Sequence, residues 1–212
     1  CTHIEVVVNK DGSLTVVDNG RGIPVGMHEK LQKSALEVVM TILHAGGKFD
    51  HDTYKVSGGL HGVGISCVNA LSQKVRAEVR REGKIWRQEY ERGKPTTAVD
   101  AIGESKETGT IITFWPDPEI FETLEFKYET LANRLRELSY LNSGLYLNLR
   151  DDRELDENGN PKQETFFSEG GLREFVKFLD ESRTPLIDRP IYVKAKEDNV
   201  EVEVALQYNT GY

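Results

Sequence analysis

The chain has 212 residues, with 35 acidic and 27 basic side chains and a formal net charge of -8 at pH 7. It is long enough to bury a substantial core in one domain, or in one domain and part of a second. Its acidic balance argues against a module that binds nucleic acid through phosphates, and no apolar run approaches the roughly 20 residues of a membrane-spanning helix. Cys1 and Cys67 lack the spacing of metal ligands or of a disulfide framework, which fits a reducing cytoplasm.

A β-hairpin is predicted at the start of the chain. Residues 3–8 and 14–17 are rich in strand-forming side chains, and Asp11-Gly12 between them is typical of a tight turn. The second strand leads directly into the glycine-containing loop 18–24. Because the first strand begins almost at once and no initiator Met precedes it, we expect the chain to be a piece of a longer protein.

A helix is predicted to begin at Ser34, because Glu37 follows at the spacing of a capping box. Its buried face is expected to contain four apolar residues: Leu36, Val39, Met40 and Leu43. The polar and glycine-rich stretch 44–62 is then too long for an ordinary connection. A loop of this length inside a compact domain is typical of a functional or mobile segment.

The remaining elements mix helices with paired strands. Helices are predicted at 63–71, 128–141 and 172–179. Strands are predicted at 74–80, 84–90, 110–115, 145–149, 163–167, 191–196 and 200–208. A proline-containing linker is expected before the last two strands. Because hairpins dominate, we predict an α+β fold in which helices cover one face of an antiparallel or mixed sheet.

The first of two candidate binding loops is Asp18-Asn19-Gly20-Arg21-Gly22-Ile23-Pro24. It places a carboxylate at the end of a strand, beside glycines that let another group approach the backbone closely. A carboxylate accepts hydrogen bonds only, so it suits an exocyclic amine such as the amino group of adenine. For this loop alone, an Asx-turn that closes the hairpin is the favoured interpretation.

The second candidate loop is Gly58-Gly59-Leu60-His61-Gly62-Val63-Gly64, which leads into a predicted helix. Backbone N–H groups and the positive end of a helix dipole can together bind phosphate. The loop is neither a Walker A motif nor a Rossmann fingerprint, and taken alone it is equally compatible with a flexible linker. The two loops lie about 40 residues apart and flank a helix and a long segment, as a base pocket and a phosphate pocket would.

Four strings of the sequence carry a family resemblance: 18–24, 43–49, 54–64 and 108–110. They resemble the ATPase region of the DNA gyrase B subunits, which are bacterial type II topoisomerases of the GHKL ATPase family. The resemblance covers essentially the whole chain and implies the Bergerat fold, a two-layer α/β sandwich with a mixed, mostly antiparallel sheet. It implies a GHKL ATP-binding domain over 1–183 and the first strands of a transducer domain over 184–212.

The resemblance also implies an ATP site. Asp18 would accept a hydrogen bond from the adenine amino group, and Gly22 and Thr110 would complete the adenine site, directly or through an ordered water. Ile23 and Pro24 would form an apolar wall.

Further residues would complete this site. Tyr54 would lie at the adenine and Lys48 near the phosphates, while Arg21 and Arg81 would line the pocket mouth, where coumarin inhibitors of the family bind. The backbone N–H groups that would bind the phosphates belong to Gly59, Leu60, His61, Gly62, Val63 and Gly64.

The resemblance implies that ATP binding closes two such domains into a dimer gate for DNA strand passage and negative supercoiling. The gyrase A subunit and DNA would bind regions outside this chain. One alternative is the ATPase subunit of topoisomerase IV. Another is a nucleotide- or inhibitor-binding module without turnover. A histidine kinase or MutL-type relative conflicts with the string 54–64.

In this family, a Glu that activates the attacking water and an Asn that holds Mg²⁺ lie on an earlier helix, which would precede Cys1. We therefore assign no catalytic and no metal-binding residue within the chain. Because a general base must lie within hydrogen-bond reach of the water, we expect the chain alone to release phosphate from ATP poorly or not at all.

Overall fold

The computed structural model describes residues 1–29, 31–43, 62–198 and 200–211. Its contacts divide the chain into two compact units. The first unit comprises Cys1, His3–Phe126 and Arg150–Gln163, and the second comprises Thr2, Lys127–Leu149 and Glu164–Tyr212. All described residues that were predicted to bind nucleotide belong to the first unit.

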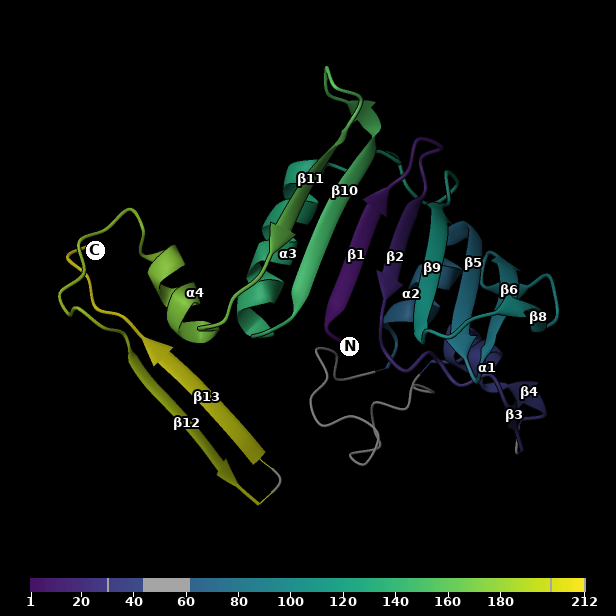
Figure 1. Cartoon of the computed structure of the whole chain (residues 1–212), viewed down its shortest axis with the longest axis horizontal. Helices are drawn as coiled ribbons and strands as arrows, with labels where there is room; N and C mark the ends of the chain where they lie inside the picture. Colours follow the sequence, from purple (N-terminus) through teal and green to yellow (C-terminus); the bar gives the residue numbers. More distant parts are fainter. Residues whose placement is uncertain (30, 44–61, 199, 212) are drawn as a thin grey trace. The chain divides into compact units, whose positions relative to one another are not determined.

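The first unit is built around an antiparallel run of strands, which lie side by side in Figure 1. The predicted hairpin is confirmed as β1 (His3–Val8) and β2 (Leu14–Asp18). From β2 the order continues through β9 (Gly109–Pro116), β5 (Ser72–Arg81) and β6 (Lys84–Glu91). Two strands that the sequence did not predict, β7 (Lys94–Pro95) and β8 (Asp100–Glu104), pair with β6.

A parallel neighbour makes the sheet mixed. β10 (Tyr146–Leu155) runs beside β1 in the same direction, because Tyr146 N donates to Thr2 O over 3.0 Å while Arg150 Nη1 pairs with Glu5 Oε1 over 2.7 Å. The chain then turns into β11 (Pro161–Phe166), the neighbour of β10.

The helix α1 (Ala35–Thr41) begins as predicted, since the Ser34 hydroxyl accepts a hydrogen bond from Glu37 N over 3.0 Å. A two-residue ribbon of β3 (Met27–His28) and β4 (Lys33–Ser34) precedes it. The predicted buried face was wrong in two positions: Val38 is buried rather than Val39, and Leu43 is 59% exposed. Leu43 is exposed because the helix ends at Thr41, so that Leu43 lies beyond its last turn.

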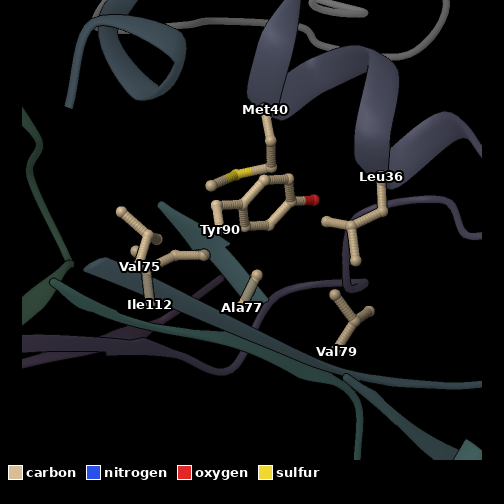
Figure 2. Packing of buried hydrophobic residues seen from close by; sticks show 7 residues of the cluster. All are labelled: Leu36, Met40, Val75, Ala77, Val79, Tyr90 and Ile112. Atoms are coloured by element: carbon tan, nitrogen blue, oxygen red, sulfur yellow. The ribbon is translucent and has the colours of Figure 1, made fainter. Parts of the chain in front are cut away.

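The core of this unit lies between α1 and the strands. Figure 2 shows Leu36 and Met40 of α1 pointing toward the sheet, with the ring of Tyr90, a β6 residue, next to both. The seven buried members of the cluster are Leu36, Met40, Val75, Ala77, Val79, Tyr90 and Ile112. Burial raises the pKa of Tyr90, whose hydroxyl donates to Gln88 Oε1 over 2.6 Å. The helix α2 (Gly64–Ala70) packs on α1 and on β5.

The second unit contains α3 (Tyr128–Leu141) and α4 (Leu172–Leu179), both with the predicted bounds. The Tyr140 ring of α3 stacks on Phe175 of α4 with 5.3 Å between ring centroids. The last two strands, β12 (Ile191–Glu197) and β13 (Val200–Leu206), form an antiparallel hairpin. The predicted domain boundary between 183 and 184 stays a prediction. Among the described residues, no helix is both long and apolar enough to cross a membrane.

Candidate functional site

Asp18 and Thr110 are brought together by strand pairing. Asp18 is the last residue of β2, and its Cα pairs with that of Thr110 on β9. Side chains directly opposite each other on neighbouring strands lie on the same face of a sheet. The next pair along the same face is Val16 with Ile112, and Ile112 belongs to the buried cluster. The carboxylate therefore lies at the edge of the face that α1 covers.

The carboxylate of Asp18 is held by its own loop. Its Oδ1 accepts a hydrogen bond from Gly20 N over 2.7 Å, so the Asx-turn that the sequence favoured is present. This bond orients the carboxylate and leaves it further acceptor capacity, because a carboxylate has about four acceptor positions. An Asx-turn and a ligand-binding carboxylate are thus compatible roles for the same side chain.

Two glycines allow the backbone around Asp18 to approach the sheet closely. A Cβ on Gly109 would lie 2.1 Å from the Asp18 carbonyl oxygen. A Cβ on Gly22, whose φ is +73°, would lie 2.8 Å from the Arg80 carbonyl oxygen and 3.0 Å from Val79 Cγ1. Any side chain would therefore push the loop 18–24 away from the ends of β5 and β9.

Arg81, the last residue of β5, contacts the same loop. Its Nη1 donates to Gly22 O over 2.9 Å and more weakly to Arg21 O over 3.4 Å. Its Nε contacts Glu82 Oε1 over 3.2 Å. The Arg81 side chain is 31% exposed, and its role at a pocket mouth stays a prediction.

Residues next to both glycine-rich loops pack against the same buried cluster. Ile23 of the first loop and Ile65, the second residue of α2, both pack against the seven-residue buried cluster. Gly62 has a φ of +60°, and the chain enters α2 through Val63 and Gly64. The Ser66 hydroxyl donates back to Val63 O over 3.0 Å, which fixes this entry.

The other predicted residues are distributed as follows. Arg21 and Pro24 of the first loop are both exposed. Five predicted residues lie outside the described part of the chain: Lys48, Tyr54, Gly59, Leu60 and His61. Gly109 was not predicted as a site residue, although its position just before Thr110 in a Thr-Gly-Thr string was a usable signal.

This arrangement offers a half-buried acceptor beside a buried hydroxyl-bearing residue, since Thr110 is 6% exposed. An apolar side chain, Ile23, belongs to the same loop as the acceptor. A planar, partly apolar ring with a hydrogen-bond donor at its edge matches these features. The described residues bring together no group of three or more His, Cys, Asp or Glu side chains that could hold a metal ion.

A known family model matches the first part of the chain. The model described as "Histidine kinase-, DNA gyrase B-, and HSP90-like ATPase" matches residues 1–120. This range includes β1, β2 and β9, and therefore both Asp18 and Thr110.

Among curated proteins, the B subunit of DNA gyrase from Clostridium acetobutylicum is 53% identical over 213 residues, covering 100% of this chain and 32% of that protein. For Haloferax volcanii the identity is 52%, covering 98% of this chain and 32% of the relative. For Staphylococcus epidermidis it is 50%, covering 100% and 32%. The chain thus spans about a third of the length of these relatives.

Among solved structures, the chain is similar to the 43K ATPase domain of Thermus thermophilus gyrase B in complex with an aminocoumarin. The TM-score is 0.81 at 41% identity, covering 100% of this chain and 52% of that one. The predicted GHKL fold, a mixed sheet with helices, is confirmed by this likeness together with the matching family model.

Proposed function

Because the chain belongs to the family of histidine kinase-, DNA gyrase B- and HSP90-like ATPases, we propose that it is the ATP-binding region of a DNA gyrase B subunit. The observation that carries this proposal is the pairing of Asp18 with Thr110 at the edge of the covered sheet face. The identity of about 50% with gyrase B subunits over nearly the whole chain supports the choice within the family.

Adenine recognition is assigned to Asp18. Its carboxylate accepts from the exocyclic amino group, while Thr110 and the Gly22 backbone complete the hydrogen bonds at the purine edge. Ile23, which packs on the buried cluster, supplies one apolar wall with Pro24 beside it. A guanine base carries a carbonyl in place of the amino group, and a carboxylate facing that oxygen would repel it.

The mouth of the pocket is assigned to Arg21 and Arg81. Because Arg81 holds the Gly22 carbonyl over 2.9 Å, it both shapes the adenine loop and presents a cation at the entrance. The solved gyrase B relative was crystallised with an aminocoumarin. We propose that coumarin-type inhibitors bind this chain beside Arg81.

The phosphates are assigned to the second loop. The backbone N–H groups of 59–64 would bind them, with Lys48 nearby and Tyr54 at the adenine. Mg²⁺ belongs to the proposed activity of the intact subunit. None of the roles assigned to the described residues depends on the metal.

For the intact subunit we propose the gyrase B activity. ATP binding would close a homodimeric gate, and hydrolysis would reset it during DNA strand passage that produces negative supercoils. The gyrase A subunit and DNA are the proposed partners, bound by regions beyond these 212 residues. We also propose a cytoplasmic location, where a DNA gyrase would meet its DNA.

The direct test is calorimetric titration of the chain with a non-hydrolysable ATP analogue and with the matching GTP analogue. The proposal predicts saturable binding of the ATP analogue and at least about 100-fold weaker binding of the GTP analogue. The reason is that the Asp18 carboxylate and the guanine carbonyl are both acceptors, so neither finds a hydrogen-bond donor. Equal binding of the two analogues, or binding of neither, would contradict it.

A further inference from the structure

We propose that Asn69 is a positioning residue for nucleotide binding, because it clamps the helix that follows the second glycine loop onto the helix that follows the first. This inference rests on the proposed function. It concerns a side chain that lies outside both loops and that the sequence did not indicate.

The geometry of the clamp is simple. Asn69 Nδ2 donates a hydrogen bond to the carbonyl oxygen of Met40 over 2.9 Å, and the two residues are 29 positions apart in the sequence. Both residues are 0% exposed. The bond therefore joins α2 to α1 inside the protein, where competition from water is weak.

The acceptor of this bond is a helix-terminal carbonyl. The last four carbonyl groups of an α-helix have no partner within the helix, and α1 ends at Thr41. Val38 O accepts from Ile42 N at the C-cap, while Met40 O accepts from Asn69. The Asn69 side chain of α2 thus supplies a donor to a carbonyl in the last turn of α1.

The donor is a polar side chain that lies in the interior of the protein. Asn69 is the second-to-last residue of α2 and is 0% exposed. Burying an amide costs free energy unless the amide is hydrogen-bonded. Its Nδ2 group bonds across the interface to Met40 O of the other helix, and this bond offsets part of that cost.

The clamp links the two halves of the proposed site through the core. On one side, Met40 belongs to the cluster against which Ile23 of the adenine loop packs. On the other side, Asn69 lies in the helix that begins at Gly64, directly after Gly62 and Val63. Fixing α2 on α1 therefore fixes the start of α2 relative to Asp18, and a ligand that spans both loops gains affinity when this distance is preset.

The test compares Asn69→Leu with Gln88→Met. Both substitutions replace a buried amide by an apolar side chain of similar size. Gln88 donates to Thr97 O over 3.1 Å and accepts from the Tyr90 hydroxyl over 2.6 Å, and it belongs to β6, which carries no proposed site residue. Melting temperatures and the Kd for the non-hydrolysable ATP analogue are measured for the wild type and both variants. Asn69→Leu is expected to raise Kd about tenfold, whereas Gln88→Met lowers the melting temperature with less than about a twofold change in Kd.

Two further measurements keep the proposal falsifiable if Asn69→Leu does not fold. In Asn69→Ser, the serine side chain is too short to reach Met40 O. This variant is therefore also expected to raise the Kd for the ATP analogue. In the wild type without nucleotide, the NMR signals of the Asn69 side-chain amide are expected to exchange slowly with solvent.

An Asn69 variant with a lower melting temperature and the wild-type Kd would contradict the positioning role of Asn69. Rapid solvent exchange of the Asn69 side-chain amide in the wild type would contradict it as well. Failure of the wild type itself to bind the analogue would instead overturn the proposed function.

Discussion

Two aspartates near opposite ends of β2 accept the same hydrogen bond, from the backbone N–H two residues later to the carboxylate, but differ in role. Asp11, in the turn before β2, accepts from Ser13 N over 3.0 Å, just as Asp18, at the end of β2, accepts from Gly20 N over 2.7 Å. Asp11, however, also accepts from the Ser13 hydroxyl over 2.6 Å and from Trp115 Nε1 over 3.2 Å. Both of its oxygens thus serve the fold.

The difference teaches what distinguishes a structural carboxylate from a binding one. Asp18 uses Oδ1 for its turn and stands half-buried opposite Thr110, at the edge of the core face. Asp11 is exposed, and both of its carboxylate oxygens accept hydrogen bonds that hold the turn and Trp115. Both aspartates form the same turn, so the turn does not distinguish them. Asp18 suits a ligand because it is half-buried and has acceptor positions beyond the one that the turn uses.

The largest effect is expected at Gly109, the first residue of β9, which contacts the Asp18 end of β2. Gly109→Ala would place a Cβ 2.1 Å from the Asp18 carbonyl oxygen, so β2 and β9 would have to separate. We expect a loss of about 3 kcal/mol or more in the free energy of unfolding, together with loss of nucleotide binding. Urea denaturation and analogue titration measure the two effects.

The matched control is Gly12→Ala in the turn of Asp11. Gly12 has a φ of +82°, but nothing lies within 4 Å of its Cβ position. Only backbone strain of about 1 kcal/mol is expected, with unchanged Kd. Equal losses in the two variants would show that the close approach at Gly109 has no special role.

A smaller effect is expected at Arg81. Arg81→Ala removes the hydrogen bond to Gly22 O and loosens the adenine loop, so Kd for the ATP analogue is expected to rise about three- to tenfold. The neighbouring Arg80→Ala breaks an exposed ion pair with Glu107 at 3.1 Å and is expected to change Kd by less than about twofold. If both variants bind alike, the loop does not depend on Arg81.

The smallest effect concerns pH at the structural aspartate. The hydrogen bond from the Ser13 side chain is the largest cause that lowers the pKa of Asp11. Ionised Asp11 therefore stabilises the folded state at pH values above the ordinary aspartate pKa. This contribution is lost as the pH falls through the lowered pKa of the folded state. The difference in melting temperature between wild type and Asp11→Asn should therefore shrink below about pH 4. A difference that stays constant down to pH 2 would contradict this role.

Much of the fold could be predicted because local signals were strong. The capping pair Ser34 and Glu37, the bounds 128–141 of α3 and the hairpin of β1 with β2 all follow from residues close together in sequence. The strand β8 was missed because all five of its residues are exposed and show no alternation. The buried face of α1 was misassigned because a helix of only two turns leaves the last apolar residue outside it.

The site was harder to predict from residues alone. Asp18 and Thr110 are 92 positions apart, and nothing in the local pattern pairs β2 with β9. The contact of Arg81 with Gly22 and that of Asn69 with Met40 are equally non-local. The family resemblance supplied Asp18 and Thr110 through their motifs and implied Arg81 as a further site residue, whereas Asn69 required the structure.

The most direct test of the account is the nucleotide affinity of Asp18→Asn beside that of Asp11→Asn. An asparagine at 18 has one acceptor oxygen for two donors, Gly20 N and the adenine amino group, so Kd for the ATP analogue is expected to rise about 100-fold. Asp11→Asn should lower the melting temperature and leave Kd at the wild-type value. Wild-type affinity in Asp18→Asn, with both proteins folded, would contradict the central claim that this carboxylate reads the adenine.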